Sequence, residues 1–350
     1  MKNISISLIF FLFLGCNQND NINKVDNNIS LNSNTIHQEW HFIYDEEFYL
    51  FNKIDKKAHI HAKNSIQKYS GKGIKIAVID DSLDTLHPKM IEHISQTYNV
   101  VDDSNDVSPK KEHSHGTAVT GIIVSDTKKG IRGISPNVEL LFISIPDILS
   151  DAHVISAFDF AYQNDADIIS CSWGTNNVSD IVNEKIRSVA KKGREGRGIS
   201  IVFAVGNKGE EIKNDESAIE EVIAVGSTNK YVKVPFYSNY GKALDFVAPG
   251  GEYIGIPTLD ISSDAGFNSS DYLLYNDKNA FIGTSASAPI VSATIALMLE
   301  KNPELTREDI YEILKQSCDK IDEHNTTAHD ILSGYGKINV DNALKQIVER

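Results

Sequence analysis

The chain contains 350 residues, of which 41% are hydrophobic and 23% are charged, and its formal net charge is −14. This length suits one large α/β domain. The acidic charge argues against a nucleic-acid partner, because a surface that binds phosphates is basic. The same charge favours solubility and attracts positively charged substrates. The three cysteines imply no disulfide framework.

The first fifteen residues have the layout of an export signal. Lys2 provides a positive start, a short apolar run follows, and Gly15-Cys16 ends the segment. The run is too short for a membrane-spanning helix. The segment also resembles a bacterial lipoprotein signal, which implies lipidation of Cys16. We therefore predict a signal peptide over residues 1–15 and an exported lipoprotein anchored to a membrane of a bacterial cell envelope. A secreted or periplasmic protein with an ordinary cleaved signal, or an uncleaved anchor, is the alternative.

Residues 16–35 form a separate segment. They are rich in Asn, Asp and Ser and hold too little apolar surface to fold, which predicts a flexible tether. The rest of the chain, residues 36–350, is predicted to be one domain. Its first part, from Gln38 to Phe42, is aromatic, and we expect this cluster to pack onto the domain.

Short apolar runs alternate with helical stretches through this domain. The runs predict buried strands at 74–80, 138–144, 166–172, 199–206 and 221–227. The stretches between and after them predict helices at 116–125, 151–164, 180–192, 286–300, 306–317 and 339–348. Strands that alternate with helices predict an α/β fold with a mostly parallel central sheet and helices on both faces.

Two segments place ionisable residues at the ends of these elements. Asp80 and Asp81 directly follow a buried strand, and the carboxyl end of such strands is where sites collect in open α/β sheets. His115 begins an apolar helical stretch, and Gly116 beside it lets another segment come close.

Ser285 occupies a third position of this kind, at the start of a long apolar helix. The placement suits a nucleophile, although serine is also common there as a helix cap. A serine hydroxyl needs a base within hydrogen-bond reach, for which His115 is the candidate. The base in turn needs a carboxylate on its other ring nitrogen, and either Asp80 or Asp81 suits this role.

The three motifs occur in the order Asp, His, Ser, which is the order found in subtilisin. They read Val78-Ile79-Asp80-Asp81, His115-Gly116-Thr117 and Gly283-Thr284-Ser285-Ala286-Ser287-Ala288-Pro289. From about residue 65 onwards the chain resembles the subtilisin-like serine proteases (subtilases). Its catalytic motifs resemble those of the kexin-like members of that family. The resemblance implies a three-layer subtilisin-like fold and a serine endopeptidase that works through an acyl-enzyme intermediate. It implies Asp80 as orienting carboxylate, His115 as base and Ser285 as nucleophile.

The resemblance also implies an oxyanion hole. Asn207 follows the strand predicted at 199–206 and matches the asparagine that the family uses for this purpose. The backbone N–H of Ser285 is the second donor. An asparagine with a purely structural role in a turn is the alternative.

In the family that the chain resembles, an extended peptide pairs with backbone near Ser172, Trp173 and Gly174. Kexin-like members have an acidic pair soon afterwards, where this chain has Thr-Asn-Asn at 175–177. This difference argues against a strong demand for paired basic residues. Asp215 falls where another acidic pocket residue is expected; a solvated loop residue is the alternative interpretation.

No cofactor is required for this chemistry. Calcium is common in the family, but the loop at 125–130 contains two lysines, which suit a hard cation poorly. Calcium binding therefore stays possible without support at that loop, and no metal ligands are predicted. A Cys171 nucleophile is the alternative to a small core residue at that position. A non-catalytic protein that binds peptides in a subtilase-fold groove is the alternative function.

Overall fold

The computed structural model describes the backbone of Ile6–Ser7 and residues 38–109, 114–125, 131–262, 266–321 and 329–348. Ile6–Ser7 form strand β1, which pairs antiparallel with β5 (Ile148–Leu149). The rest of the predicted signal peptide, Cys16 and the predicted tether lie outside the described residues.

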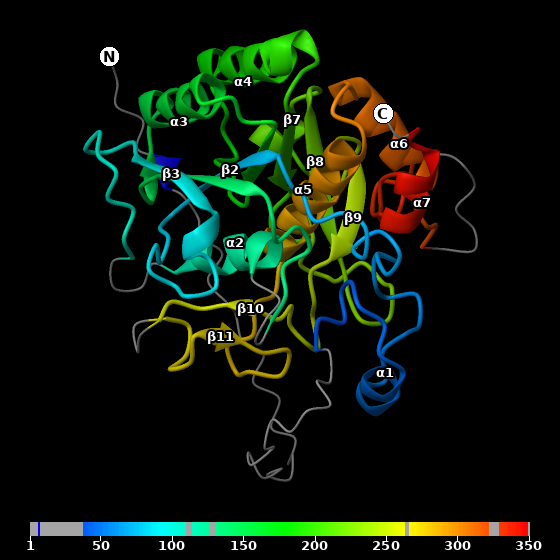
Figure 1. The fold of residues 1–350 in the computed structure, drawn as a ribbon. Coiled ribbons are helices and arrows are strands. Elements are labelled where there is room, and N and C mark those ends of the chain that lie inside the picture. The colour runs from blue at the N-terminus through cyan, green and yellow to red at the C-terminus, as the bar shows by residue number, and fades with distance from the viewer. Residues whose placement is uncertain are drawn as a thin grey trace.

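A seven-stranded sheet forms the centre of the molecule (Figure 1). Its strand order is β3-β4-β2-β6-β7-β8-β9, and every neighbouring pair is parallel. The strands are β2 (Lys75–Asp80), β3 (Ile94–Asn99), β4 (Glu139–Ser144), β6 (Ile168–Cys171), β7 (Ser200–Ala204), β8 (Val222–Thr228) and β9 (Phe246–Pro249). Because all seven run in one direction, their carboxyl ends share one edge of the sheet.

Helices cover both faces of the sheet. Alternate residues of a strand point to opposite faces. Accordingly, Ile76 and Val78 of β2 pack in one core with α2 and α5, whereas Ala77 and Ile79 pack in the other with α3 and α4. The helices are α2 (His115–Val124), α3 (Asp151–Gln163), α4 (Asp180–Lys192) and α5 (Thr284–Lys301). The result is the predicted three-layer α/β fold with a parallel central sheet (Figure 1).

Helix α5 is the internal support of the sheet. All its residues from 284 to 299 are buried, and it contacts α2 as well as strands β6, β7, β8 and β9. A helix that is apolar on every side belongs in such a central position. Its first turn therefore meets the carboxyl edge of the sheet with little freedom to move.

The predicted strands and helices are confirmed, each with bounds that differ by at most two residues from the observed ones. They include α6 (Arg307–Ser317), whose Thr306–Asp309 start is a capping box, and α7 (Val340–Gln346). The prediction missed edge strands β3 and β9, the short pair β10 (Thr258–Leu259) and β11 (Tyr272–Leu273), and helix α1 (Glu46–Asn52). Strand β3 consists mostly of polar residues, and β9 is short and ends in proline. Neither strand therefore forms a long apolar run.

The aromatic segment before α1 packs onto the domain as expected. Trp40 and Phe42 are fully buried, and the Trp40 indole N–H donates to the carbonyl oxygen of Gly255 at 2.8 Å. The Tyr49 hydroxyl donates to the carbonyl oxygen of Trp40 at 2.5 Å. This segment therefore belongs to the same core as the helix layer of α2 and α5.

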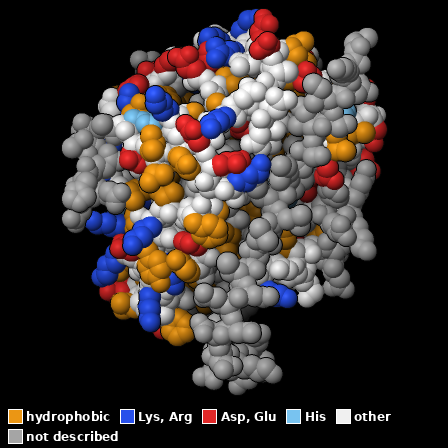
Figure 2. All heavy atoms as spheres, turned by 180° about the vertical axis from the view of Figure 1, so that it is seen from behind, with side chains coloured by type: hydrophobic (Ala, Val, Ile, Leu, Met, Phe, Trp, Pro, Cys, Tyr) orange, Lys and Arg blue, Asp and Glu red, His pale blue; other side chains and the backbone are white. Residues whose placement is uncertain are grey.

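The surface mixes charge types. On the face seen from behind in Figure 2, basic and acidic side chains lie interspersed with hydrophobic ones. No helix among the described residues combines the length and the apolar character needed to cross a membrane.

Candidate active site

Three side chains from distant parts of the chain lie at the carboxyl edge of the sheet. Asp80 is the last residue of β2, His115 is the first residue of α2, and Ser285 lies in the first turn of α5. His115 Nδ1 is 2.7 Å from Asp80 Oδ1. Asp80 is fully buried and Ser285 is only 5% exposed. The imidazole is thus held through Nδ1, which is how a carboxylate orients a general base.

Asp81 has a different role from its neighbour Asp80. Its Oδ2 accepts from the backbone N–H of His115 at 3.2 Å, and its Oδ1 accepts from that of Gly116 at 2.7 Å. Asp81 thus satisfies free N–H groups at the start of α2. Burial, and then the charge of Asp80, raises the pKa of Asp81 to about 6. It holds the helix that carries His115, whereas Asp80 holds the imidazole.

The pKa of the His115 imidazole reflects both its burial and these two carboxylates. Burial alone would lower the pKa of the imidazole, but the charge and hydrogen bond of Asp80 and the charge of Asp81 outweigh it. The net result is a His115 pKa above the usual 6.5. A base with a raised pKa accepts a proton from serine more readily once it is itself deprotonated.

Ser285 is tied to Ser172 at the end of β6 through a pair of hydrogen bonds. Ser285 Oγ donates to the Ser172 carbonyl oxygen at 3.2 Å, and Ser172 Oγ donates to the Ser285 carbonyl oxygen at 3.0 Å. The second bond has a local cause: Pro289, four residues on, has no N–H to offer the Ser285 carbonyl within the helix. The Ser172 hydroxyl supplies the missing donor, so Ser285 and Ser172 are fixed to each other.

Asn207 lies in the turn after β7 and contacts Thr284, the residue directly before Ser285. Its Oδ1 accepts from Thr284 N at 2.8 Å and from Thr284 Oγ1 at 2.9 Å. These bonds fix the amide so that Nδ2 remains as the donor group. A Cβ atom at Gly283 would lie 2.8 Å from Nδ2, and the backbone there has φ +139°, so glycine is required. The predicted oxyanion donor therefore stands next to Ser285 with its orientation set by Thr284.

The predicted peptide-binding residues form an edge segment, which we define as residues 172–178. Among the described residues, no hydrogen bond uses the backbone of Trp173 or Gly174. The Trp173 side chain is buried, and its indole N–H donates to the Ile79 carbonyl oxygen at 2.9 Å. The segment thus offers backbone rather than the Trp173 ring to its surroundings.

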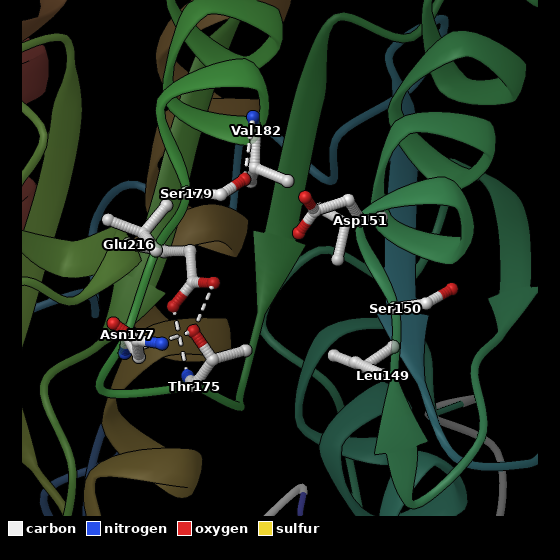
Figure 3. A pocket seen from close by; sticks show the side chains of 10 residues that line it. Leu149, Ser150, Asp151, Thr175, Asn177, Ser179, Val182 and Glu216 are labelled. Atoms are coloured by element: carbon white, nitrogen blue, oxygen red, sulfur yellow. Dashed lines mark hydrogen bonds between the residues drawn. The ribbon is translucent and has the colours of Figure 1, made fainter. Parts of the chain in front are cut away.

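The edge segment rests on an acidic pair, Asp215 and Glu216, both buried. Glu216 Oε2 and Oε1 accept from Thr175 N and Oγ1 at 2.9 and 2.7 Å, drawn as dashed lines in Figure 3. Asp215 accepts from Asn176 N at 3.0 Å and from Ser217 N and Oγ. Glu216 also lines a small pocket between the first turns of α3 and α4 (Figure 3). Whether Asp215 also faces a substrate stays a prediction.

Cys171 ends β6 close to the site but is fully buried. Burial raises the pKa of its thiol well above the usual 9.0, and the charges of Asp80 and Glu216 raise it further. Because the thiolate is the reactive form, these surroundings favour a core residue over a nucleophile.

Metal ligands are not grouped in the part of the chain that the structure describes: it contains no set of three or more His, Cys, Asp or Glu side chains able to hold a metal ion. Most of the loop weighed for calcium, residues 126–130, lies outside that part.

The fold and the site together define an α/β protein with a Ser-His-Asp arrangement at the carboxyl edge of a parallel sheet. Comparison with known families gives a match to the Subtilase family over residues 71–336. The chain therefore belongs to the subtilase family.

Individual relatives agree with this assignment. A calcium-dependent protease of Nostoc sp. is 32% identical over 83% of the chain and 48% of its own length. A thermophilic serine proteinase of Bacillus sp. is 30% identical over 78% of the chain and 62% of its own length. The chain thus spans about half the length of the first relative. A protease structure from Pseudoalteromonas arctica has a TM-score of 0.71 at 21% identity, covering 88% of this chain and 97% of its own. At this identity it supports the fold alone.

Sequence reasoning missed two contributors to the site. Thr284 was not singled out, although its hydroxyl accepts from Gly206 N at 3.1 Å and donates to Asn207. A hydroxyl residue directly before the predicted nucleophile, Ser285, was the available signal. Glu216 was not singled out either, and its position next to Asp215 in a loop between two buried strands was the only hint.

Proposed function

We propose that the protein is a serine endopeptidase in which Ser285, His115 and Asp80 act as a triad. The observation that carries the proposal is the 2.7 Å contact of His115 Nδ1 with Asp80, at the same sheet edge as Ser285. Membership of the subtilase family supports it.

The reaction begins when Ser285 Oγ turns from the Ser172 carbonyl oxygen toward the imidazole of His115. Its oxygen attacks the carbonyl carbon of the scissile bond while its proton passes to Nε2. The C–N bond then breaks, and the departing amine takes that proton. The acyl-enzyme ester on Ser285 is cleaved by a water molecule, which gives one proton to His115 and leaves the new acid. His115 returns that proton to Ser285 Oγ.

The negative oxygen of each tetrahedral intermediate is received by two donors, Asn207 Nδ2 and the Ser285 backbone N–H. Support comes from the Asn207 amide, whose Oδ1 is already held by Thr284 at 2.8 and 2.9 Å. A donor fixed before the reaction costs no reorganisation when charge develops.

The proposed substrate is an extended peptide or protein segment that pairs with the free backbone of Trp173 and Gly174. We extend the kexin-like resemblance to the catalytic motifs only. The residues at 175–177 are Thr-Asn-Asn, and Thr175 and Asn176 turn their N–H groups to the acidic pair. The acidic pair is thereby occupied by the protein itself, which supports a broad preference rather than a demand for paired basic residues.

Calcium has no step in this mechanism. The first relative is named a calcium-dependent protease, so a structural calcium ion is compatible with the proposed function. Every proton and every bond in the proposed reaction is handled by side chains and water.

For location, we propose export and anchoring through lipid on Cys16, with residues 16–35 as tether. The sequence of the first sixteen residues supports this. Lipoprotein maturation attaches more than one acyl chain, which makes anchoring stable. Mass spectrometry of the mature N-terminus checks it: an acylated Cys16 is expected, and an unmodified terminus beyond residue 16 would reject the anchor.

The activity is tested with a fluorophosphonate probe and a peptide library on the purified full chain. The wild type is expected to be labelled and to cleave peptides. Ser285→Ala is expected to abolish labelling and to reduce cleavage by more than about 10⁴-fold. Ser287→Ala is the matched control, because that hydroxyl donates to the Ala248 carbonyl oxygen at 3.0 Å. Peptide binding without labelling or cleavage would favour the non-catalytic alternative.

A further inference from the structure

We propose that Glu216, assisted by Asp215, is a positioning residue that holds the edge segment in register with the nucleophile for peptide binding. This inference rests on the proposed protease function. It concerns a side chain that touches neither the triad nor the oxyanion donors.

The two carboxylate oxygens of Glu216 form their hydrogen bonds with one residue, Thr175. Both of its carboxylate oxygens are used by Thr175, at 2.9 Å from the backbone N–H and 2.7 Å from the hydroxyl. Glu216 is 1% exposed, so water does not compete for these bonds. A two-point contact fixes both the position and the rotation of the residue that it holds.

Asp215 holds the next stretch of the same backbone. Its Oδ2 accepts from Asn176 N at 3.0 Å, while its Oδ1 is fixed by Ser217 N and Oγ at 3.0 and 2.7 Å. A Cβ atom at Gly174 would lie 2.6 Å from Asp215 Oδ2. Gly174 therefore lies directly against this carboxylate, with no room for a side chain.

Two further bonds complete the contact between the loops. Val178 N donates to the Asn214 carbonyl oxygen at 3.0 Å, and Asn214 Nδ2 donates to Asn177 Oδ1 at 3.2 Å. The edge segment is thus held at 175, 176, 177 and 178 by the loop at 214–216. At its other end, Ser172 is held by Ser285 at 3.2 and 3.0 Å.

Between these two attachments lie Trp173 and Gly174, whose backbone groups have no hydrogen bond among the described residues. A substrate strand that pairs with them is placed relative to Ser285 through Ser172 and relative to the acidic pair through Thr175. A shift of Thr175 would therefore misplace the scissile carbonyl without altering the triad. A peptide that pairs less well with this backbone binds more weakly, which raises KM while the triad stays intact.

The contact works in either protonation state of Glu216. Burial, and then the charge of Asp215, raises the pKa of Glu216 to about 7. As a carboxylate it accepts from both donors of Thr175. As a neutral acid it accepts from the N–H and donates its own O–H to the Thr175 hydroxyl, which can also accept. Glutamine can do the same, whereas alanine can do neither.

The test compares Glu216→Ala, Glu216→Gln and a control, Glu220→Ala, in the full chain. Glu220 is exposed, and no described hydrogen bond uses its side chain. Two readouts are taken: kcat and KM on a peptide that extends several residues before the cut, and the labelling rate with a small fluorophosphonate. The probe needs the triad but not the edge segment.

For Glu216→Ala, which removes both hydrogen bonds to Thr175, we expect KM to rise about tenfold, about threefold for each bond, with the labelling rate unchanged. Glu216→Gln is expected to recover most of that loss, and Glu220→Ala to match the wild type. Thr175→Val, which removes one of the two bonds, is the second variant if Glu216→Ala does not fold, and a KM rise of about threefold is expected.

Unchanged KM in Glu216→Ala would overturn the inference. Equal losses in labelling and in peptide cleavage, with no recovery in Glu216→Gln, would also overturn it, because they indicate a structural role alone. Failure of the wild type itself to react with the probe would instead reject the proposed protease function, so the two failures are distinct.

Discussion

The two sides of the candidate site use carboxylates for different purposes. On the side of the proposed triad, which we call the catalytic side, Asp80 faces an imidazole, with His115 Nδ1 at 2.7 Å. On the other side, Glu216 and Asp215 face backbone N–H groups of Thr175 and Asn176 at 2.9 and 3.0 Å. The first arrangement changes the proton affinity of a reacting group. The second fixes the path of a chain.

The difference shows that the role of a buried carboxylate near an active site depends on the group with which it forms hydrogen bonds. Asp81 makes the point most sharply, because it is adjacent to Asp80 yet bonds to the backbone N–H groups that begin α2. It resembles Glu216 in function more than it resembles Asp80. The comparison predicts that removal of the negative charge of Asp80 reduces kcat. At Asp81 and Glu216, by contrast, the loss of a hydrogen-bond acceptor is expected to have the larger effect.

Among the carboxylates compared here, the largest expected effect follows from Asp80→Asn. The Asp80 Oδ2 atom is buried and has no partner among the described residues, so an amide nitrogen fits there while Oδ1 keeps its bonds. Only the charge that supports the imidazolium is lost, and kcat is expected to fall about 10⁴-fold with little change in melting temperature.

Asp81→Asn is the matched control for that variant. Both oxygens of Asp81 accept backbone N–H groups, so an amide nitrogen faces a donor and one bond is lost. We expect a loss of about 1 kcal/mol in the free energy of unfolding and a change in kcat of less than about tenfold. Denaturant unfolding and kcat on a peptide measure both. The reverse ranking of the two kcat values would make Asp81 the orienting carboxylate.

The next largest effect is expected at the oxyanion side, from Asn207→Asp. The substituted Oδ1 still accepts from Thr284, so the local structure is kept. The donor Nδ2 is replaced by an oxygen that repels the developing charge, and kcat is expected to fall by at least about 10²–10³-fold. An unchanged kcat together with an unchanged melting temperature would remove Asn207 from the mechanism.

Much of the fold could be predicted because buried parallel strands are long apolar runs. Strands β2, β4, β6, β7 and β8 have this pattern, and each lies between two neighbours in the sheet. Strands β3 and β9 form its two edges, where partial exposure or short length removes the apolar signal. An edge strand is defined by its neighbour, and the neighbour lies elsewhere in the sequence.

The site was predictable to the extent that it sits at the ends of such elements. Asp80, His115 and Asn207 each lie at the end or start of an element that the sequence reveals. The roles of Asp81 and Glu216 were not predictable, because they depend on which backbone N–H group a carboxylate reaches. That is decided by loop geometry, and for Glu216 the partner Thr175 lies 41 residues away.

The pH dependence tests both sides of the site at once, and the smallest expected change concerns the edge segment. His115 must be neutral to accept the serine proton, and Asp80 and Asp81 raise its pKa above the usual 6.5 in spite of burial. The value of kcat/KM should therefore rise about tenfold per pH unit and reach half its plateau above pH 6.5. A profile that is flat from about pH 4 to 9 would contradict a histidine base.

The edge segment should behave differently, because Glu216 bonds to Thr175 in both of its protonation states. The ratio of peptide kcat/KM to probe labelling rate cancels the titration of His115, and it is expected to stay within about twofold through the Glu216 pKa of about 7. The contrary result is a ratio that changes with pH near 7 in the wild type and does not change with pH in Glu216→Gln. It would show that the charge of Glu216 affects peptide cleavage, and the two sides of the site would then not differ in their dependence on charge.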